Sequence, residues 1–258
     1  MFPGRVSVGV ASLMFLVLFL DRVLRAKQGM AISIRRLPAL DMIDEAIGRA
    51  TELGKPVHQA MSYASVMGAA SSPMILSGIA VMRYVSRKTS RMDTRYIVTV
   101  GNAETYSVSE EVVRSTYAEQ GKLDAYDPSM VRFLSTAQFA YTAATVGIMN
   151  REKVAANIMI GYFAAESLIL AETGHSLGAV QIAGTSVMPQ IPFFVATCDY
   201  VLIGDEVYAV SAYLDKDHAT LGTIAAQDIM KVVVGLLLLV GSLAYTFGSD
   251  FALKLLKM

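Results

Sequence analysis

The residues best suited to chemistry stand after six short runs that have the composition of β-strands. In a sheet of parallel strands, ligands bind beyond the carboxyl ends of the strands, so these polar positions are where a site is expected. Loops at strand ends are polar in most proteins, and caps and turns are therefore the alternative interpretation. The candidate ligand-binding residues are Asn102, Glu104, Glu166, Gly184, Thr185, Ser186 and Gln190.

Two of these positions define the chemistry that such a site would have. Gly184 is followed by two hydroxyl residues, and backbone N–H groups at the start of the next helix can bind an anion there. Glu166 has apolar neighbours, which can raise the pKa of a carboxyl group and make it an acid or base; pairing or solvent exposure is the simpler role. The sequence contains no Gly-x-Gly-x-x-Gly, Gly-x-x-x-x-Gly-Lys or Gly-x-Ser-x-Gly motif. It therefore gives little support to a nucleotide site or to an α/β-hydrolase.

Metal and thiol chemistry are not predicted. His58, His175 and His218 are far apart in the sequence and share no ligand spacing with Cys198. Cys198 lies at the end of an apolar run, which favours a buried, inert thiol over a nucleophile. As the single cysteine, it excludes an internal disulfide and fits a reducing compartment. The sequence thus identifies no catalytic residue, no metal site and no cofactor.

The elements that position the candidate residues alternate strictly between strand and helix. Short β-type runs predict strands at residues 57–61, 96–100, 131–134, 157–161, 179–183 and 200–203. Stretches with helical periodicity predict helices at residues 37–53, 74–90, 107–120, 136–150, 163–173, 189–198 and 205–214. This alternation predicts an α/β fold with a doubly wound, mostly parallel sheet of about six strands.

Two uncharged apolar segments stand at opposite ends of the chain. Residues 6–20 and 232–247 approach the length that spans a bilayer, and their flanks can extend them. We therefore predict an N-terminal transmembrane anchor at residues 1–28, a central α/β domain at 29–228, and a C-terminal transmembrane helix with a short tail at 229–258. The helix before the second segment has no break, so we expect a rigid connection between domain and membrane. Two core helices of a soluble protein are the alternative.

The distribution of charge gives the central domain an orientation. Five basic residues between positions 22 and 36 follow the first apolar segment, against only Arg5 before it. This bias predicts a two-pass protein of the cell membrane with its central domain in the cytoplasm, although Lys254 and Lys257 in the tail oppose it slightly. The absence of ionisable residues from both apolar runs argues against a transporter or channel. A formal net charge of zero offers no broad basic surface to nucleic acid.

Seven short segments of the central domain carry a resemblance to a known family. They are RLPALD at 36–41, IDEAIGRA at 43–50, EEVVR at 110–114, GYF at 161–163, ESLILAE at 166–172, QIAGT at 181–185 and QIPFF at 190–194. These segments resemble an uncharacterised family of prokaryotic membrane-anchored proteins, known mainly as a domain of unknown function. The resemblance implies a shared fold and membrane attachment but no activity, and the loop at 62–73 fits the family least well.

The sequence as a whole favours a non-enzymatic protein. We expect a membrane-anchored α/β protein that self-associates as a scaffold or serves as a structural subunit of a membrane complex. Its partners would be the lipid bilayer and either further copies of the chain or other membrane subunits. The alternative is a cytoplasmic-face enzyme or small-ligand binder that uses the loops at the strand carboxyl ends, centred on Thr185, Ser186, Glu166 and Glu104.

Overall fold

The structure is a computed structural model that describes residues 6–28, 37–64, 68, 71–215 and 218–246. The chain forms an α/β unit of residues 35–215 and a second unit that combines residues 1–34 with 216–258. The α/β unit thus ends before the predicted boundary at residue 228, because the last helix groups with the terminal unit. That helix begins at His218, and residues 216–217 lie outside the described part, so the rigid connection stays a prediction.

The α/β unit contains one sheet of six strands, all parallel to their neighbours, in the order β3-β2-β1-β4-β5-β6. The strands are β1 Val57–Ala60, β2 Tyr96–Val100, β3 Val131–Phe133, β4 Ala156–Ile160, β5 Val180–Thr185 and β6 Tyr200–Ile203. This confirms the predicted α/β sheet, and each strand falls within a few residues of its predicted run. The order reverses between β1 and β4, which makes this place the topological switch point of a doubly wound sheet.

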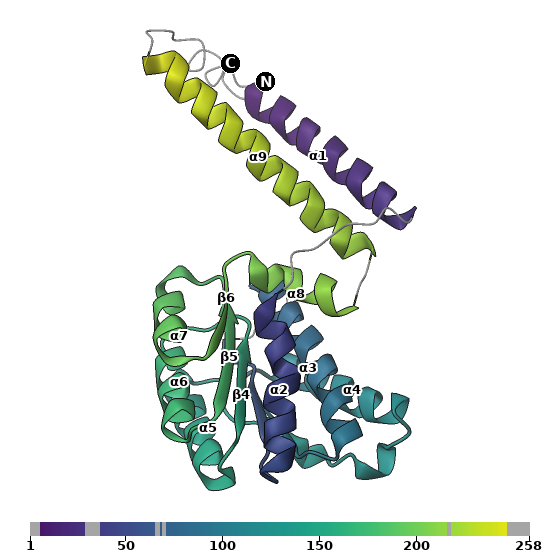
Figure 1. The fold of residues 1–258 in the computed structure, drawn as a ribbon, viewed down its shortest axis with the longest axis vertical. Coiled ribbons are helices and arrows are strands. Elements are labelled where there is room, and N and C mark those ends of the chain that lie inside the picture. Colours follow the sequence, from purple (N-terminus) through teal and green to yellow (C-terminus); the bar gives the residue numbers. More distant parts are fainter. Residues whose placement is uncertain (1–5, 29–36, 65–67, 69–70, 216–217, 247–258) are drawn as a thin grey trace. The chain divides into compact units, whose positions relative to one another are not determined.

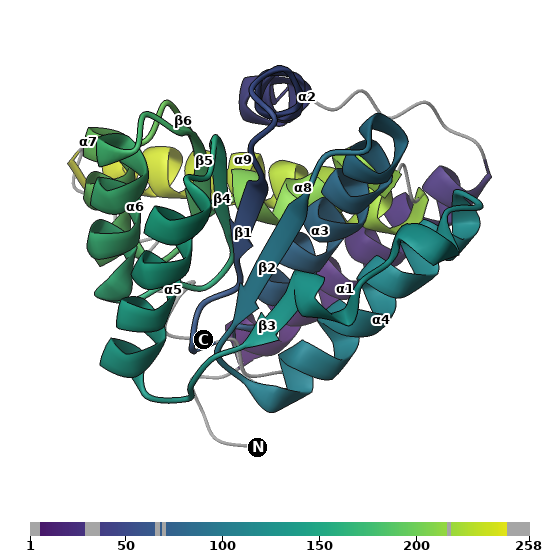
Figure 2. The ribbon, with the colours of Figure 1, turned by 90° about the horizontal axis from the view of Figure 1, so that it is seen from below.

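Helices cover both faces of this sheet. The described helices of the unit are α2 Pro38–Glu52, α3 Ser72–Met92, α4 Ala103–Glu119, α5 Gln138–Glu152, α6 Glu166–Ser176, α7 Ile191–Thr197 and α8 Glu206–Asp215, with short 3-10 turns η1 Leu123–Ala125, η2 Pro128–Met130 and η3 Met188–Gln190. Figure 2 shows α5, α6 and α7 as one layer, with α3 and α4 on the opposite face of the strands. Contacts place α2 and α8 on the α3 side.

Each face of the sheet buries its own apolar cluster. On the α3 side, Ile43 and Ile47 of α2 pack with Val98 of β2 and Ile158 of β4. On the α6 side, the second cluster includes Phe163 and Phe194, whose rings meet edge to face at 5.5 Å between centroids. Helix α6 begins at Glu166 and not at the predicted residue 163, and Phe163 packs into the core before the helix starts.

At the free edge of β6, a side chain of α8 binds one outward-facing backbone N–H. Gly204 N–H donates to Thr185 of β5, so the N–H of the preceding residue, Ile203, points away from the sheet. Glu206 Oε2 accepts a hydrogen bond from that Ile203 N–H at 3.1 Å. This donor is therefore not free to pair with a further strand.

The second unit consists of two described helices that pack against each other, α1 Val6–Lys27 and α9 His218–Thr246 (Figure 1). Within α9, residues 222–246 form the one described helix long and apolar enough to cross a membrane, with a mean hydropathy of 2.0. Among the described residues, no helix near the N-terminus meets this measure, so the predicted N-terminal span is not found there.

Candidate functional site

The predicted candidate Glu166 lies at the switch point of the sheet. It is the first residue of α6, after β4, and only 1% of its surface is exposed. Ser62, which follows β1, donates its hydroxyl proton to Glu166 Oε1 at 2.6 Å, and Gln138 Nε2 of α5 donates to Oε2 at 3.0 Å. The carboxylate therefore joins residues that follow three different strands, β1, β3 and β4.

The backbone around this carboxylate is tightly constrained. Ser62 has a φ of 63°, a left-handed conformation that is uncommon for residues other than glycine. Gly101, which follows β2, lies so close to this segment that an added Cβ would be 2.3 Å from Tyr63 Cα and 2.9 Å from the Ser135 carbonyl oxygen. Backbone strain of this kind is concentrated at functional sites. In this structure the Ser62 hydroxyl is already hydrogen-bonded to the Glu166 carboxylate.

Gln190 and Ser186, two further predicted residues, each have a partner of their own. Gln190 Oε1 accepts a hydrogen bond from Ser167 Oγ at 2.7 Å, which connects η3 to the first turn of α6. The Ser186 hydroxyl lies 2.7 Å from Tyr208 Oη on α8. The first contact extends the Glu166 cluster along α6, whereas the second lies apart from it.

The remaining predicted residues serve local structure. Asn102 Oδ1 accepts from Glu104 N–H at 2.9 Å and so caps α4, while the Glu104 side chain is exposed. Thr185 Oγ1 accepts from the N–H of Val187. An added Cβ on Gly184 would be 2.9 Å from Leu202 Cβ, so this glycine permits strand packing. Among the described residues, no hydrogen bond joins these side chains to Glu166.

A buried row of polar side chains crosses the middle of the sheet. His58 of β1, Asn157 of β4 and Gln181 of β5 are directly paired in register and are at most 1% exposed. His58 Nδ1 lies 2.8 Å from Asn157 Oδ1, and Asn157 Nδ2 donates to Gln181 Oε1 at 3.0 Å. We call these three residues the polar rung.

The direction of the hydrogen bonds in the polar rung is fixed at one end. Gln181 Nε2 donates at 2.8 Å to two backbone carbonyls, of α6 and α7, which only accept. Gln181 Oε1 must then accept from Asn157, whose Oδ1 accepts in turn from His58 Nδ1. In a neutral imidazole with its proton on Nδ1, His58 Nε2 accepts from Thr99 Oγ1, 3.0 Å away. Burial favours this neutral form, because it lowers the pKa of His58 to about 4 although the hydrogen bond to Asn157 raises it.

Sequence reasoning missed the polar rung because it searched only beyond the strand ends. A signal was present, since His58, Asn157 and Gln181 each occupy the second position of their strand. Gly174 is part of the same arrangement: a Cβ there would clash with Gln181 Oε1. Gly174 lies inside α6, where the absence of a Cβ leaves room for the Gln181 amide. The left-handed glycine that follows the end of α6 is Gly178, with a φ of 67°.

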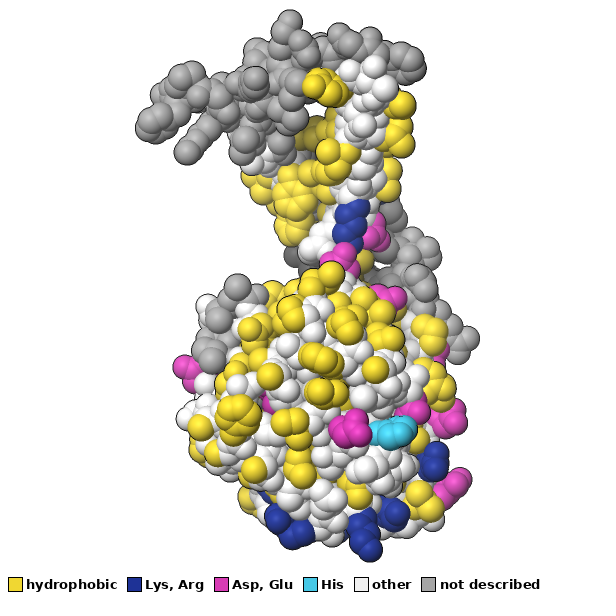
Figure 3. Space-filling model, turned by 90° about the vertical axis from the view of Figure 1, so that its left-hand side faces the viewer, with side chains coloured by type: hydrophobic (Ala, Val, Ile, Leu, Met, Phe, Trp, Pro, Cys, Tyr) yellow, Lys and Arg dark blue, Asp and Glu magenta, His cyan; other side chains and the backbone are white. Residues whose placement is uncertain are grey.

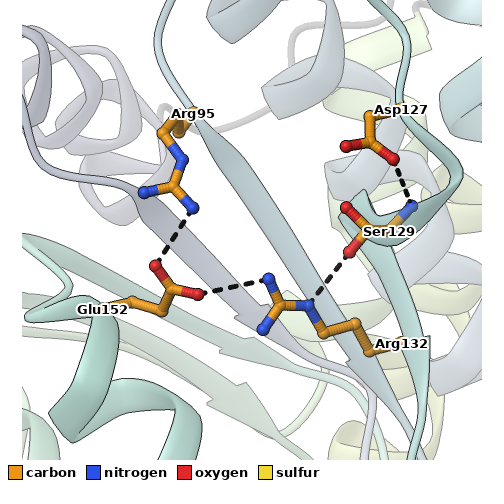
Figure 4. Close-up of polar contacts among 5 residues, drawn as sticks. All are labelled: Arg95, Asp127, Ser129, Arg132 and Glu152. Atoms are coloured by element: carbon orange, nitrogen blue, oxygen red, sulfur yellow. Dashed lines mark hydrogen bonds and ion pairs between the residues drawn. The ribbon is translucent and has the colours of Figure 1, made fainter.

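A cluster of ion pairs and hydrogen bonds, which we call the ion cluster, lies at the β3 edge of the sheet (Figure 4). Glu152, near the end of α5, accepts from Arg95 Nη2 at 3.0 Å and from Arg132 Nη2 at 3.2 Å. Arg132 Nε donates to the Ser129 carbonyl, and Asp127 accepts from Ser129 N–H at 2.8 Å. Burial raises the pKa of Glu152, but the hydrogen bonds and charges of both arginines outweigh it and lower the value. The cluster attaches edge strand β3 to α5.

Thiol and metal chemistry have no support in the described residues. Burial raises the pKa of the half-buried Cys198 thiol to about 12, which keeps it protonated near neutral pH. No group of three or more His, Cys, Asp or Glu side chains within the described part could hold a metal ion. The Glu166 cluster and the polar rung therefore provide hydrogen-bonding groups and one carboxylate, and no nucleophile is identified among the described residues.

Comparison with known proteins identifies one family. Its model, described as a domain of unknown function (DUF6754), matches residues 2–256, which include both apolar ends and the whole α/β unit. No curated protein and no solved structure gives a significant match. The predicted resemblance to an uncharacterised family is therefore confirmed, while a prokaryotic and membrane-anchored character stays a prediction.

Proposed function

The chain belongs to the family DUF6754, a domain of unknown function, and we propose that it is a membrane-anchored, non-enzymatic scaffold whose α/β unit self-associates. Both terminal helices enter the bilayer in this proposal, and the α/β unit lies in the cytoplasm. The same arrangement would serve a structural subunit of a larger membrane complex.

The exposed apolar surface of the second unit carries the anchoring part of this proposal. Large side chains of α9 are exposed to 46–68%, and those of α1 to 38–63%. Water disfavours such surfaces at a cost of about 25 cal/mol per Å², whereas hydrocarbon does not. The exposed residues are Val10, Leu13, Met14, Phe15, Leu16, Val17, Leu20 and Leu24 of α1, and Val232, Val234, Leu236, Leu237, Leu238, Leu239, Val240, Leu243 and Tyr245 of α9.

The polar groups of the α/β unit support a structural role. Glu166, Gln190 and Asn102 are each engaged by a neighbouring donor, and the buried polar rung is satisfied along its length. Side chains held in this way stabilise one conformation and leave few hydrogen-bonding groups for a substrate.

Two measurements test the proposal. The recombinant chain should remain with the membrane fraction after high-speed centrifugation and alkaline washing, and it should enter solution only with detergent. In mild detergent, light scattering coupled to gel filtration should give the mass of at least a dimer at micromolar concentration. A chain that stays dispersed without detergent contradicts the anchoring, and a monomer contradicts the self-association.

A second candidate function is favoured by the convergence on Glu166. Ligands of doubly wound sheets bind at the switch point, where this carboxylate, Ser62 and Gln138 meet. If the unit binds a small polar ligand there, native mass spectrometry of the gently purified protein should detect a bound molecule. The variant Glu166→Gln should lose that molecule, and a folded wild-type protein with no added mass would remove this candidate.

A further inference from the structure

One face of the α/β unit exposes large apolar side chains from neighbouring elements. We call it the α6–α7 surface: Phe139 of α5, Leu168 and Ile169 of α6, Met188 of η3, and Phe193 and Val195 of α7, which are exposed to 37–76%. Figure 3 shows hydrophobic side chains spread over this side of the unit, with Lys and Arg gathered at its lower margin. Several large apolar side chains exposed on one face are typical of an interaction surface.

Hydrogen bonds beneath the surface hold these elements in fixed positions. Gln138, beside Phe139, donates to Glu166 at the start of α6. Ser167 donates to Gln190, two residues from Met188. The apolar side chains of α5, α6 and η3 are therefore borne by helix starts that are tied to one another, and a preorganised surface loses little conformational entropy when it docks.

From this surface we propose that the α6–α7 surface is the interface between two copies of the chain, an inference that rests on the proposed self-association. Two polar residues of α6 argue for a second copy. Glu172 and His175 are exposed on the same stripe as Leu168, one turn apart, and α7 has no charged residue. A two-fold axis near Thr173 sets the acceptor Glu172 of each copy against the imidazole of the other, so the face is complementary to itself.

The test compares dimer mass in the full chain in mild detergent. The variant Val195→Glu places a carboxylate among the apolar side chains of the proposed interface and should weaken dimerisation by about 100-fold or more. Leu76→Glu is the matched control, because Leu76 is 52% exposed against 54% for Val195 but lies on α3, on the opposite side of the sheet. The control should retain the wild-type mass, and near-UV circular dichroism should show both variants folded.

Each outcome separates the interface from the self-association itself. A wild-type monomer contradicts the proposed function. A wild-type dimer that survives Val195→Glu overturns the α6–α7 surface alone and leaves self-association to other parts of the chain. Loss of the dimer in the Leu76→Glu control also overturns the inference, because the effect would then be independent of position.

Two further measurements test the interface in membranes and its two-fold symmetry. In membranes, Thr173→Cys, beside the two-fold axis, in a Cys198→Ser background should form a dimer with a short bis-maleimide, whereas Leu76→Cys in that background should not; equal cross-linking contradicts the interface. His175→Glu should weaken dimerisation by about 3- to 10-fold, and adding Glu172→His should restore it. A different partner protein would produce no such rescue, so its absence overturns the two-fold arrangement.

Discussion

Acidification should destabilise the α/β unit through His58. The imidazole is fully buried, its Nε2 lies 3.0 Å from Thr99 Oγ1, and burial lowers its pKa from 6.5 to about 4. The unfolded chain therefore binds a proton at a higher pH than the folded chain does. Stability from this group is complete above about pH 6.5 and is lost as the pH falls from about 6.5 to about 4.

The expected size follows from the shift. One pKa unit corresponds to about 1.4 kcal/mol, so the full difference is about 3 kcal/mol, of which about 2 kcal/mol is lost between pH 7.5 and pH 5. The variant His58→Gln puts a side-chain amide in place of the imidazole in the polar rung, and this amide cannot titrate. The difference in unfolding free energy between wild type and variant should therefore shrink by about 2 kcal/mol over this interval.

Urea unfolding of the full chain in a non-ionic detergent measures this difference. The chain has 12 tyrosines and no tryptophan, and every tyrosine except Tyr245 lies within residues 35–215. Near-UV circular dichroism of tyrosine thus reports on the α/β unit and not on the terminal helices. Parallel losses of stability in wild type and His58→Gln between pH 7.5 and 5 would refute the assignment of a neutral, low-pKa imidazole.

Three more predictions use the same unfolding assay or a simple modification. Glu152→Gln should cost about 1 kcal/mol, because it removes the charge that both arginines of the ion cluster bind; the exposed i,i+3 pair member Glu111, changed to Gln, should cost little. Gly101→Ala should cost about 3 kcal/mol or more, because backbone atoms block its Cβ, whereas Gly48→Ala in open space within α2 should be neutral or stabilising by up to about 1 kcal/mol. Cys198 in the folded protein should react with a maleimide at pH 8 more than about 100-fold more slowly than in urea, and equal rates would contradict its raised pKa.

The fold could be predicted because each central strand is a short β-type run. β1, β2 and β4 are buried along their whole length, and such runs, each followed by a helical stretch, are typical of a parallel sheet. Strand order and register could not be predicted, since they depend on which helices pack on which face. For that reason the sequence did not reveal that His58, Asn157 and Gln181 lie side by side.

The candidate site could be predicted only in part. Glu166 was expected at a strand end, and the structure brings Ser62 and Gln138 to it. The hydroxyls after β5 were expected to share that site, but Thr185 and Ser186 bind other groups. Polar residues after strands have the same composition whether they cap, turn or bind, and only their three-dimensional partners distinguish these roles.

Glu206 has a consequence for the proposed self-association. If copies are confined to a membrane, as proposed, they meet more often than in bulk water, and an open strand edge offers them a template for pairing. By holding the outward amide of Ile203, the carboxylate removes one donor from this template. Strand pairing at the end of β6 then competes less with assembly through side-chain surfaces.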